Sequence, residues 1–76
     1  MVIRVGDLLK INAAGQDKVM CVERVLKISS ENSYRVYDVD DKNSRSDIYD
    51  KDIKQIKVDG SWIAYVPQGK QKPFII

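Results

Sequence analysis

The sequence predicts a mainly β fold, in which five or six short antiparallel strands form a small, partly open barrel. Several segments alternate apolar and polar residues with a period of two, as half-buried strands do. Residues that favour turns separate these segments at close intervals. The chain has 76 residues, enough for one domain, and its 43% hydrophobic and 32% charged residues are typical of a globular protein.

Two glycines delimit the first predicted strand. Gly6 precedes this strand, which we expect over Asp7–Asn12. Gly15 lies in the loop that follows, where glycine tolerates a positive φ.

The next segment, Lys18–Ile28, fits two structures. As a strand, it would place four apolar side chains on one face, interrupted by Arg24: Met20, Val22, Leu26 and Ile28. As a helix, it would begin after Asp17 as the N-cap, with apolar residues recurring every three or four positions. Because β-branched residues lose χ1 freedom in a helix, the three valines and the isoleucine favour the strand.

The middle of the chain alternates strongly and then becomes polar. We expect a strand over Ser33–Val39, with Tyr34 and Val36 on one face and Arg35 and Tyr37 on the other. A loop over residues 40–44, a short strand over residues 45–49 and a single helical turn at residues 50–52 should follow.

A hairpin closes the predicted domain. Asp59-Gly60 favours a two-residue turn between strands over Ile53–Val58 and Ser61–Val66. We expect Trp62 in this hairpin to be substantially buried. Residues 1–66 should therefore form a single barrel domain, and residues 67–76 a C-terminal tail or an edge strand.

Several chemistries lack the residues they need. The chain has no histidine, so the commonest general base and most zinc sites are absent. Cys21 has only apolar neighbours in sequence and is expected to be a buried structural thiol. The run that begins at Asp38 has Asn43 and Tyr49 where a calcium loop needs glycine and glutamate. We expect no enzyme activity, no cofactor and no metal.

The single cysteine excludes an intrachain disulfide, and the first residues resemble neither a signal peptide nor a membrane span. The sequence therefore predicts a cytoplasmic protein that does not bind a membrane. Its oligomeric state stays open.

The segments from Val5 to Ile56 resemble an SH3-like barrel of the Tudor and KOW kind. The resemblance consists of Val5-Gly-Asp-Leu-Leu-Lys-Ile, the long apolar strand, Tyr34-Arg-Val-Tyr-Asp-Val-Asp-Asp, and Asp47-Ile-Tyr with Asp52-Ile-Lys-Gln-Ile. It implies a small barrel that binds a partner, in which a few aromatic rings form a cage for a cation or stack on bases.

A weaker similarity connects Ser46-Asp47-Ile48-Tyr49 to the small plasmid-borne dihydrofolate reductases, tetrameric SH3-like barrels whose signature reads Val-Gln-Ile-Tyr. The family's glutamine is Asp47 here, and the lysine of its catalytic pore falls on Ile11. An added negative charge would repel an anionic cofactor. The resemblance therefore supports the fold more than the activity.

Charge and aromatic residues together suggest a binding function. Residues 38–52 hold six aspartates against three basic residues, whereas residues 53–76 hold four lysines against one aspartate. We expect a non-enzymatic module for protein–protein interaction, with a partner-binding surface made of Tyr37, Tyr49, Asp38, Asp40, Asp41 and Asp47. The alternatives are a nucleic-acid-binding barrel that uses its exposed lysines and arginines, and an oligomeric pore enzyme resembling the reductases.

Overall fold

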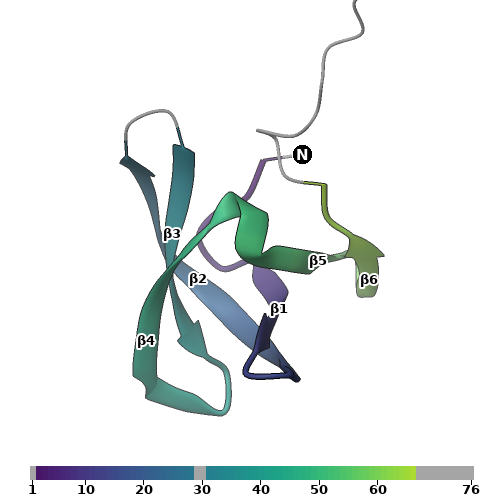
Figure 1. The fold of residues 1–76 in the computed structure, drawn as a ribbon. Helices are drawn as coiled ribbons and strands as arrows, with labels where there is room; N and C mark the ends of the chain where they lie inside the picture. Colours follow the sequence, from purple (N-terminus) through teal and green to yellow (C-terminus); the bar gives the residue numbers. More distant parts are fainter. Residues whose placement is uncertain (1, 29–30, 67–76) are drawn as a thin grey trace, which may run out of the picture.

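The computed structural model describes residues 2–28 and 31–66, which form one curled sheet of antiparallel strands (Figure 1). The strands are β1 (Leu8–Ala13), β2 (Gln16–Ile28), β3 (Glu31–Asp38), β4 (Asp41–Tyr49), β5 (Ile53–Val58) and β6 (Ser61–Ala64), with a 3-10 turn, η1 (Asp50–Asp52), between β4 and β5. The order across the sheet is β4-β3-β2-β1-β5-β6. The fold is therefore mainly β, as predicted. The sheet is not closed, which is compatible with a small, partly open barrel.

Two hairpins have tight turns with positive φ. Asp59 and Gly60 have φ of 51° and 83°, and they connect the paired residues Val58 and Ser61, which confirms the predicted hairpin. The turn between β1 and β2 has the same form, with φ of 54° and 82° at Ala14 and Gly15. The predicted loop before Lys18 is therefore only two residues long.

The long ambiguous segment is a strand, because β2 runs from Gln16 to Ile28. The pairing with β3 shifts between Val22 and Arg24, so Glu23 is the extra residue of a bulge. This bulge changes the alternation at the point where Arg24 interrupted the apolar face. Met20 and Val22 are buried as expected, Leu26 is half-buried, and the side chain of Ile28 lies outside the described residues.

The prediction of a loop over residues 40–44 was wrong, because β4 already begins at Asp41. Asp38 pairs with Asp41 across a two-residue turn, and Asp38 Oδ1 accepts a hydrogen bond from the Asp40 amide at 2.8 Å. The turn is closed by this local side-chain bond, so β4 begins at Asp41, four residues before the expected strand. Residues 41–47 are all exposed, and β4 supplies only Ile48 to the core.

The core consists of alternating inward residues from β1 to β5, together with one residue that precedes β1 and one that follows β6. Its members are Ile3, Leu9, Ile11, Met20, Val22, Tyr34, Val36, Ile48, Ile53, Ile56 and Tyr65. Tyr34 and Val36 of β3 are both in this set, which confirms the predicted face. The prediction for the last strand needs one change, because its aromatic residue in the core is Tyr65, just after β6.

Trp62 is half-buried and lies outside this core. It pairs with Lys57 across the last hairpin, and its ring contacts side chains on the outer face of the sheet. β6 ends at Ala64, and the next residue, Tyr65, is the buried residue of this segment. The Tyr65 amide donates to the Lys54 carbonyl at 3.0 Å. The predicted tail, residues 67–76, lies outside the described residues.

Candidate functional site

The outer face of the sheet carries a row of side chains that crosses the strands. The register pairs Trp62 with Lys57, Leu8 with Cys21, and Cys21 with Tyr37. Because Leu9 pairs with Ile56, Leu8 lies beside Lys57 and joins the two parts of the row. Residues paired across antiparallel strands point to the same face, so aromatic, basic and apolar groups meet on this surface.

One groove of about 610 Å³ lies at the Trp62 end of this row. Its lining comes from β1, β2, β3, β5 and β6 and from the turn that follows β3: Leu8, Gln16, Asp17, Lys18, Val19, Asp38, Val39, Asp40, Lys57 and Trp62. The Val39 amide donates to the Val19 carbonyl at 3.2 Å, which holds the turn after β3 against β2. Leu8, Val19 and Val39 form its apolar part.

Two lysines meet over the ring of Trp62 at one end of the groove. The ammonium nitrogens of Lys10 and Lys57 lie 4.5 Å and 5.8 Å from the ring centroid, which are distances of cation–π contacts. Neither lysine forms an ion pair with a carboxylate of residues 2–28 or 31–66. Both positive charges therefore lie near the ring of Trp62.

Three aspartates lie at the other end of the groove. Asp38 is held in place, because it accepts the Asp40 amide and lies 3.7 Å from Lys18. Asp17 receives only a long hydrogen bond of 3.4 Å from the Asn12 side chain, and Asp40 is exposed. Lys18 therefore balances one of the three charges, and the carboxylates of Asp17 and Asp40 can meet a cationic group.

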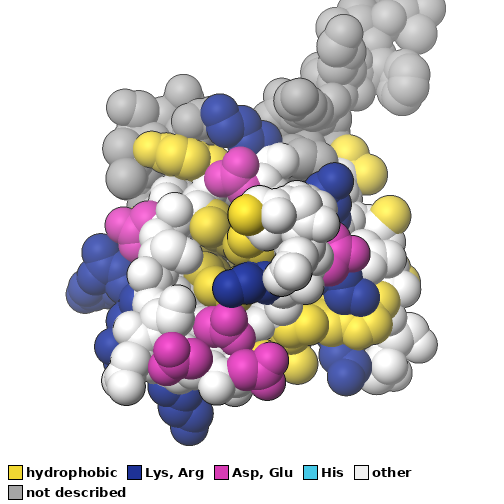
Figure 2. Space-filling view, turned by 60° about the horizontal axis from the view of Figure 1, so that its bottom comes forward, with side chains coloured by type: hydrophobic (Ala, Val, Ile, Leu, Met, Phe, Trp, Pro, Cys, Tyr) yellow, Lys and Arg dark blue, Asp and Glu magenta, His cyan; other side chains and the backbone are white. Residues whose placement is uncertain are grey.

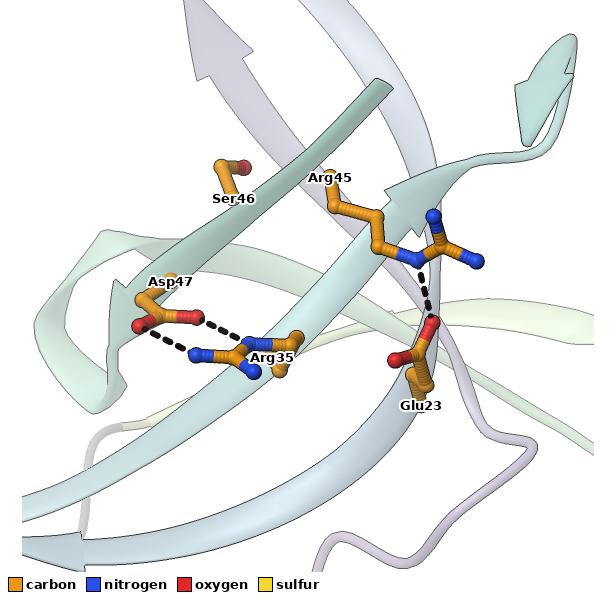
Figure 3. Close-up of a pocket in the computed structure, with 5 residues that line it drawn as sticks. All are labelled: Glu23, Arg35, Arg45, Ser46 and Asp47. Carbon is orange, nitrogen blue, oxygen red and sulfur yellow. Dashed lines mark hydrogen bonds and ion pairs between the residues drawn. The ribbon is translucent and has the colours of Figure 1, made fainter. Parts of the chain in front are cut away.

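A second hollow, of about 390 Å³, lies over β2, β3 and β4 and is lined by Glu23, Arg35, Arg45, Ser46 and Asp47 (Figure 3). Arg35 donates to both oxygens of Asp47 at 2.9 and 3.3 Å, and Arg45 donates to Glu23 at 2.7 Å. The Arg35 hydrogen bonds lower the pKa of the Asp47 carboxyl. Each guanidinium is therefore already paired with a carboxylate. These two ion pairs link the exposed strand β4 to β3 and β2.

The structure separates the residues predicted for partner binding. Tyr37 lies opposite Arg45 of β4, and Tyr49 of β4 lies opposite Ser33. Arg45 and Tyr49 are four residues apart, so Tyr37 and Tyr49 are separated by about 13 Å along the strands. The ammonium nitrogen of Lys51 lies 5.7 Å from the ring centroid of Tyr49. Tyr37 and Tyr49 therefore do not form a cage together.

The predicted aspartates divide in the same way. Asp38 and Asp40 line the Trp62 groove. Asp41 instead accepts the Asn43 amide at 3.1 Å, and Asp47 is paired with Arg35. Sequence reasoning missed Asp17 and Lys57, because only the strand register brings them to Trp62 and the turn after β3.

Cys21 differs from the expected buried thiol. It is half-buried on the outer face, between its pairing partners Leu8 and Tyr37, and contributes nothing to the core. A hydrogen bond between its thiol and the Tyr37 hydroxyl raises the pKa of Tyr37. The alternation of β2 explains its position, because the flanking residues Met20 and Val22 point inward.

No family model, no curated protein and no solved structure matches this chain. Within the described part of the chain, no group of three or more Cys, Asp or Glu side chains could hold a metal ion. Among the same residues, no helix is long and apolar enough to cross a membrane.

Proposed function

We propose that this chain is a non-enzymatic, cytoplasmic binding module of the SH3-like kind, and that its groove at Trp62 binds an extended segment of a partner protein. The observation that carries the proposal is the groove itself. It combines an aromatic ring, an apolar part and exposed carboxylates of Asp17 and Asp40. Peptide-binding grooves use the same combination, in which aromatic and apolar groups provide contact area and charges select side chains.

The charges in the groove favour a partner with a basic residue. A lysine or arginine beside Asp17 and Asp40 would form ion pairs at the rim, and an apolar neighbour would cover Val19 and Val39. Of the surface expected from the sequence, this proposal keeps Asp38 and Asp40. It takes Trp62 as the aromatic residue and leaves out Tyr37, Tyr49, Asp41 and Asp47.

A nucleic acid fits this groove less well. Lys10, Lys57 and Trp62 offer two cations and a ring, which are the groups that bind single strands. A phosphate chain that crossed the groove would then meet three carboxylates. Figure 2 shows acidic, basic and hydrophobic side chains mixed on one face, without a continuous basic surface.

The reductase alternative has less support than either binding function. Ile11, at the position of the family's pore lysine, is 8% exposed and belongs to the core. Asp47, at the position of the family's glutamine, is paired with Arg35. Neither side chain is available to bind a cofactor in the manner of that family.

The test is a titration of the ¹⁵N-labelled protein with a peptide that contains arginine two residues from leucine, monitored by amide chemical shifts. We expect the largest shifts at Val19, Val39 and the Trp62 indole. Trp62→Ala should weaken binding about tenfold, and Asp40→Asn about two- to fivefold. The control is Asp59→Asn, which removes an exposed charge outside the groove at a positive φ that asparagine tolerates.

Shifts confined to other surfaces, or equal binding by Trp62→Ala and the control, would overturn the proposal. A parallel titration uses a single-stranded oligonucleotide at about 50 mM salt. Shifts at Lys10, Lys57 and Trp62 that appear with the oligonucleotide and not with the peptide would assign the groove to nucleic acid.

A further inference from the structure

The Trp62 groove carries opposite charges at its two ends. Lys10 and Lys57 meet at the ring, and no carboxylate of the described residues pairs with them. Asp17 and Asp40 lie at the other end, beside the turns after β1 and β3. Leu8, Val19 and Val39 lie between the two ends and bring no charge.

We infer that the groove selects a dipolar segment, in which an acidic residue and a basic residue flank an apolar one. This inference rests on the proposed function and adds the partner's charge order. The acidic side chain would pair with the two lysines, which a purely basic segment would leave without a counter-charge. The basic side chain would pair with Asp40 and Asp17, and the apolar side chain would cover the middle.

The strand spacing sets the distance between the two ligand charges. Lys57 is on β5 and Asp40 follows β3, with β1 and β2 between them, so three strand spacings of about 4.8 Å give about 14 Å. An extended ligand rises about 3.4 Å per residue, so its charged residues should be about four positions apart.

A separation of four residues also lets the acidic, apolar and basic side chains of the ligand face the groove together. Alternate residues of an extended chain point to the same side. Positions one, three and five of a ligand would therefore all face the groove. The expected pattern is acidic, any, apolar, any, basic.

The inference is tested with four peptides of equal length and the same ¹⁵N-labelled protein. The dipolar peptide contains Glu-Ser-Leu-Ser-Arg. The basic and acidic peptides replace its glutamate or its arginine with glutamine. The compact peptide contains Ser-Glu-Leu-Arg-Ser, which keeps the composition and shortens the charge separation.

We expect the dipolar peptide to bind about two- to fivefold more tightly than each of the other three, as rim ion pairs allow. Lys57→Gln should weaken binding of the dipolar and acidic peptides and leave the basic peptide unchanged. Asp40→Asn should weaken binding of the dipolar and basic peptides only. Lys54→Gln is the matched control, because Lys54 is an exposed lysine of β5 outside the groove.

The outcomes separate this inference from the proposed function. Equal binding of the basic and dipolar peptides, together with no effect of Lys57→Gln, would overturn the dipolar inference and leave a groove for basic peptides. Equal binding of the compact and dipolar peptides would overturn the predicted spacing. Failure of all four peptides to shift groove residues would overturn both.

Discussion

The hydroxyl of Tyr65 donates a hydrogen bond of 2.5 Å to Oδ1 of Asp50, and thereby connects the end of the last hairpin to η1. The same oxygen accepts the Tyr34 hydroxyl of β3 at 3.1 Å. Asp50 is only 8% exposed, so these hydroxyls compensate a carboxylate that would otherwise be costly to bury. Three separate parts of the chain are joined at this group.

Removing the Tyr65 hydroxyl should therefore destabilise the domain without changing its fold. We expect Tyr65→Phe to lower the free energy of unfolding by about 1–3 kcal/mol, because a buried carboxylate loses a donor. Urea unfolding monitored by Trp62 fluorescence measures the change. Tyr49→Phe is the control, since Tyr49 is exposed, and an equal effect of both substitutions would contradict the role of the Asp50 contact.

The same cluster predicts a loss of stability at alkaline pH. Burial, followed by the charge of Asp50, raises the pKa of Tyr34 from 10.0 to about 12, and burial raises the pKa of Tyr65 as well. The unfolded chain releases these protons at a lower pH than the folded chain does. Their contribution to stability is therefore complete below about pH 10 and decreases as the pH rises toward 12.

Urea midpoints measured between pH 8 and pH 11.5 test this dependence. We expect a constant midpoint up to about pH 9.5 and a steady decrease above it, with a smaller decrease in Tyr34→Phe, which has one of the two groups removed. A midpoint that does not change up to pH 11.5 would show that the two hydroxyls titrate normally in the folded protein.

Trp62 and Tyr65 should differ in their contribution to the core. Tyr65 is 8% exposed and belongs to the core, so Tyr65→Ala should cost about 3–5 kcal/mol and unfold much of the protein. Trp62→Ala removes a ring that is only half-buried under lysines, and should cost about 1–2 kcal/mol. Thermal unfolding of both variants, monitored by circular dichroism, compares them. A larger loss for Trp62→Ala would place the tryptophan in the core after all.

Local patterns were sufficient to predict most of the fold. Alternation identified β3, β-branched residues identified β2 as a strand, and Asp59-Gly60 identified the last turn. Each of these signals acts between neighbours in sequence. The start of β4 was missed because Asp38 closes a turn with its own side chain, and a polar strand with exposed residues resembles a loop in sequence.

The candidate site was less predictable, because it depends on register. Asp38 and Asp40 were expected at a binding surface, but their aromatic partner was sought at Tyr37 and Tyr49. Trp62 reaches the same groove because β5 and β6 pair beside β1. A single sequence contains no local signal for that arrangement, since the paired strands lie about 45 residues apart.

Strand β4 should be the strand most readily released from the sheet. It forms one edge, has exposed residues from 41 to 47, and is linked to its neighbours by two surface ion pairs, Arg35–Asp47 and Arg45–Glu23. We expect Arg45→Gln to accelerate amide hydrogen exchange in β4 severalfold and to leave exchange in β1 unchanged. Salt at about 0.5 M should reproduce part of this effect, because surface ion pairs are screened. Uniform acceleration in β1 and β4 would indicate global destabilisation.

The position of Cys21 predicts a thiol that reacts in the folded protein. Its side chain is half-buried on the outer face, where the neighbouring Leu8 and Tyr37 slow access without preventing it. We expect a thiol-specific reagent such as 5,5′-dithiobis-(2-nitrobenzoate) to label Cys21 without denaturant, about tenfold more slowly than in the unfolded chain. Leu8→Ala, which uncovers the thiol, should accelerate labelling, whereas Asp59→Asn in the turn between β5 and β6 should not. Labelling at the rate of global unfolding would mean that Cys21 is buried, and the outer face of β2 would then be part of a core.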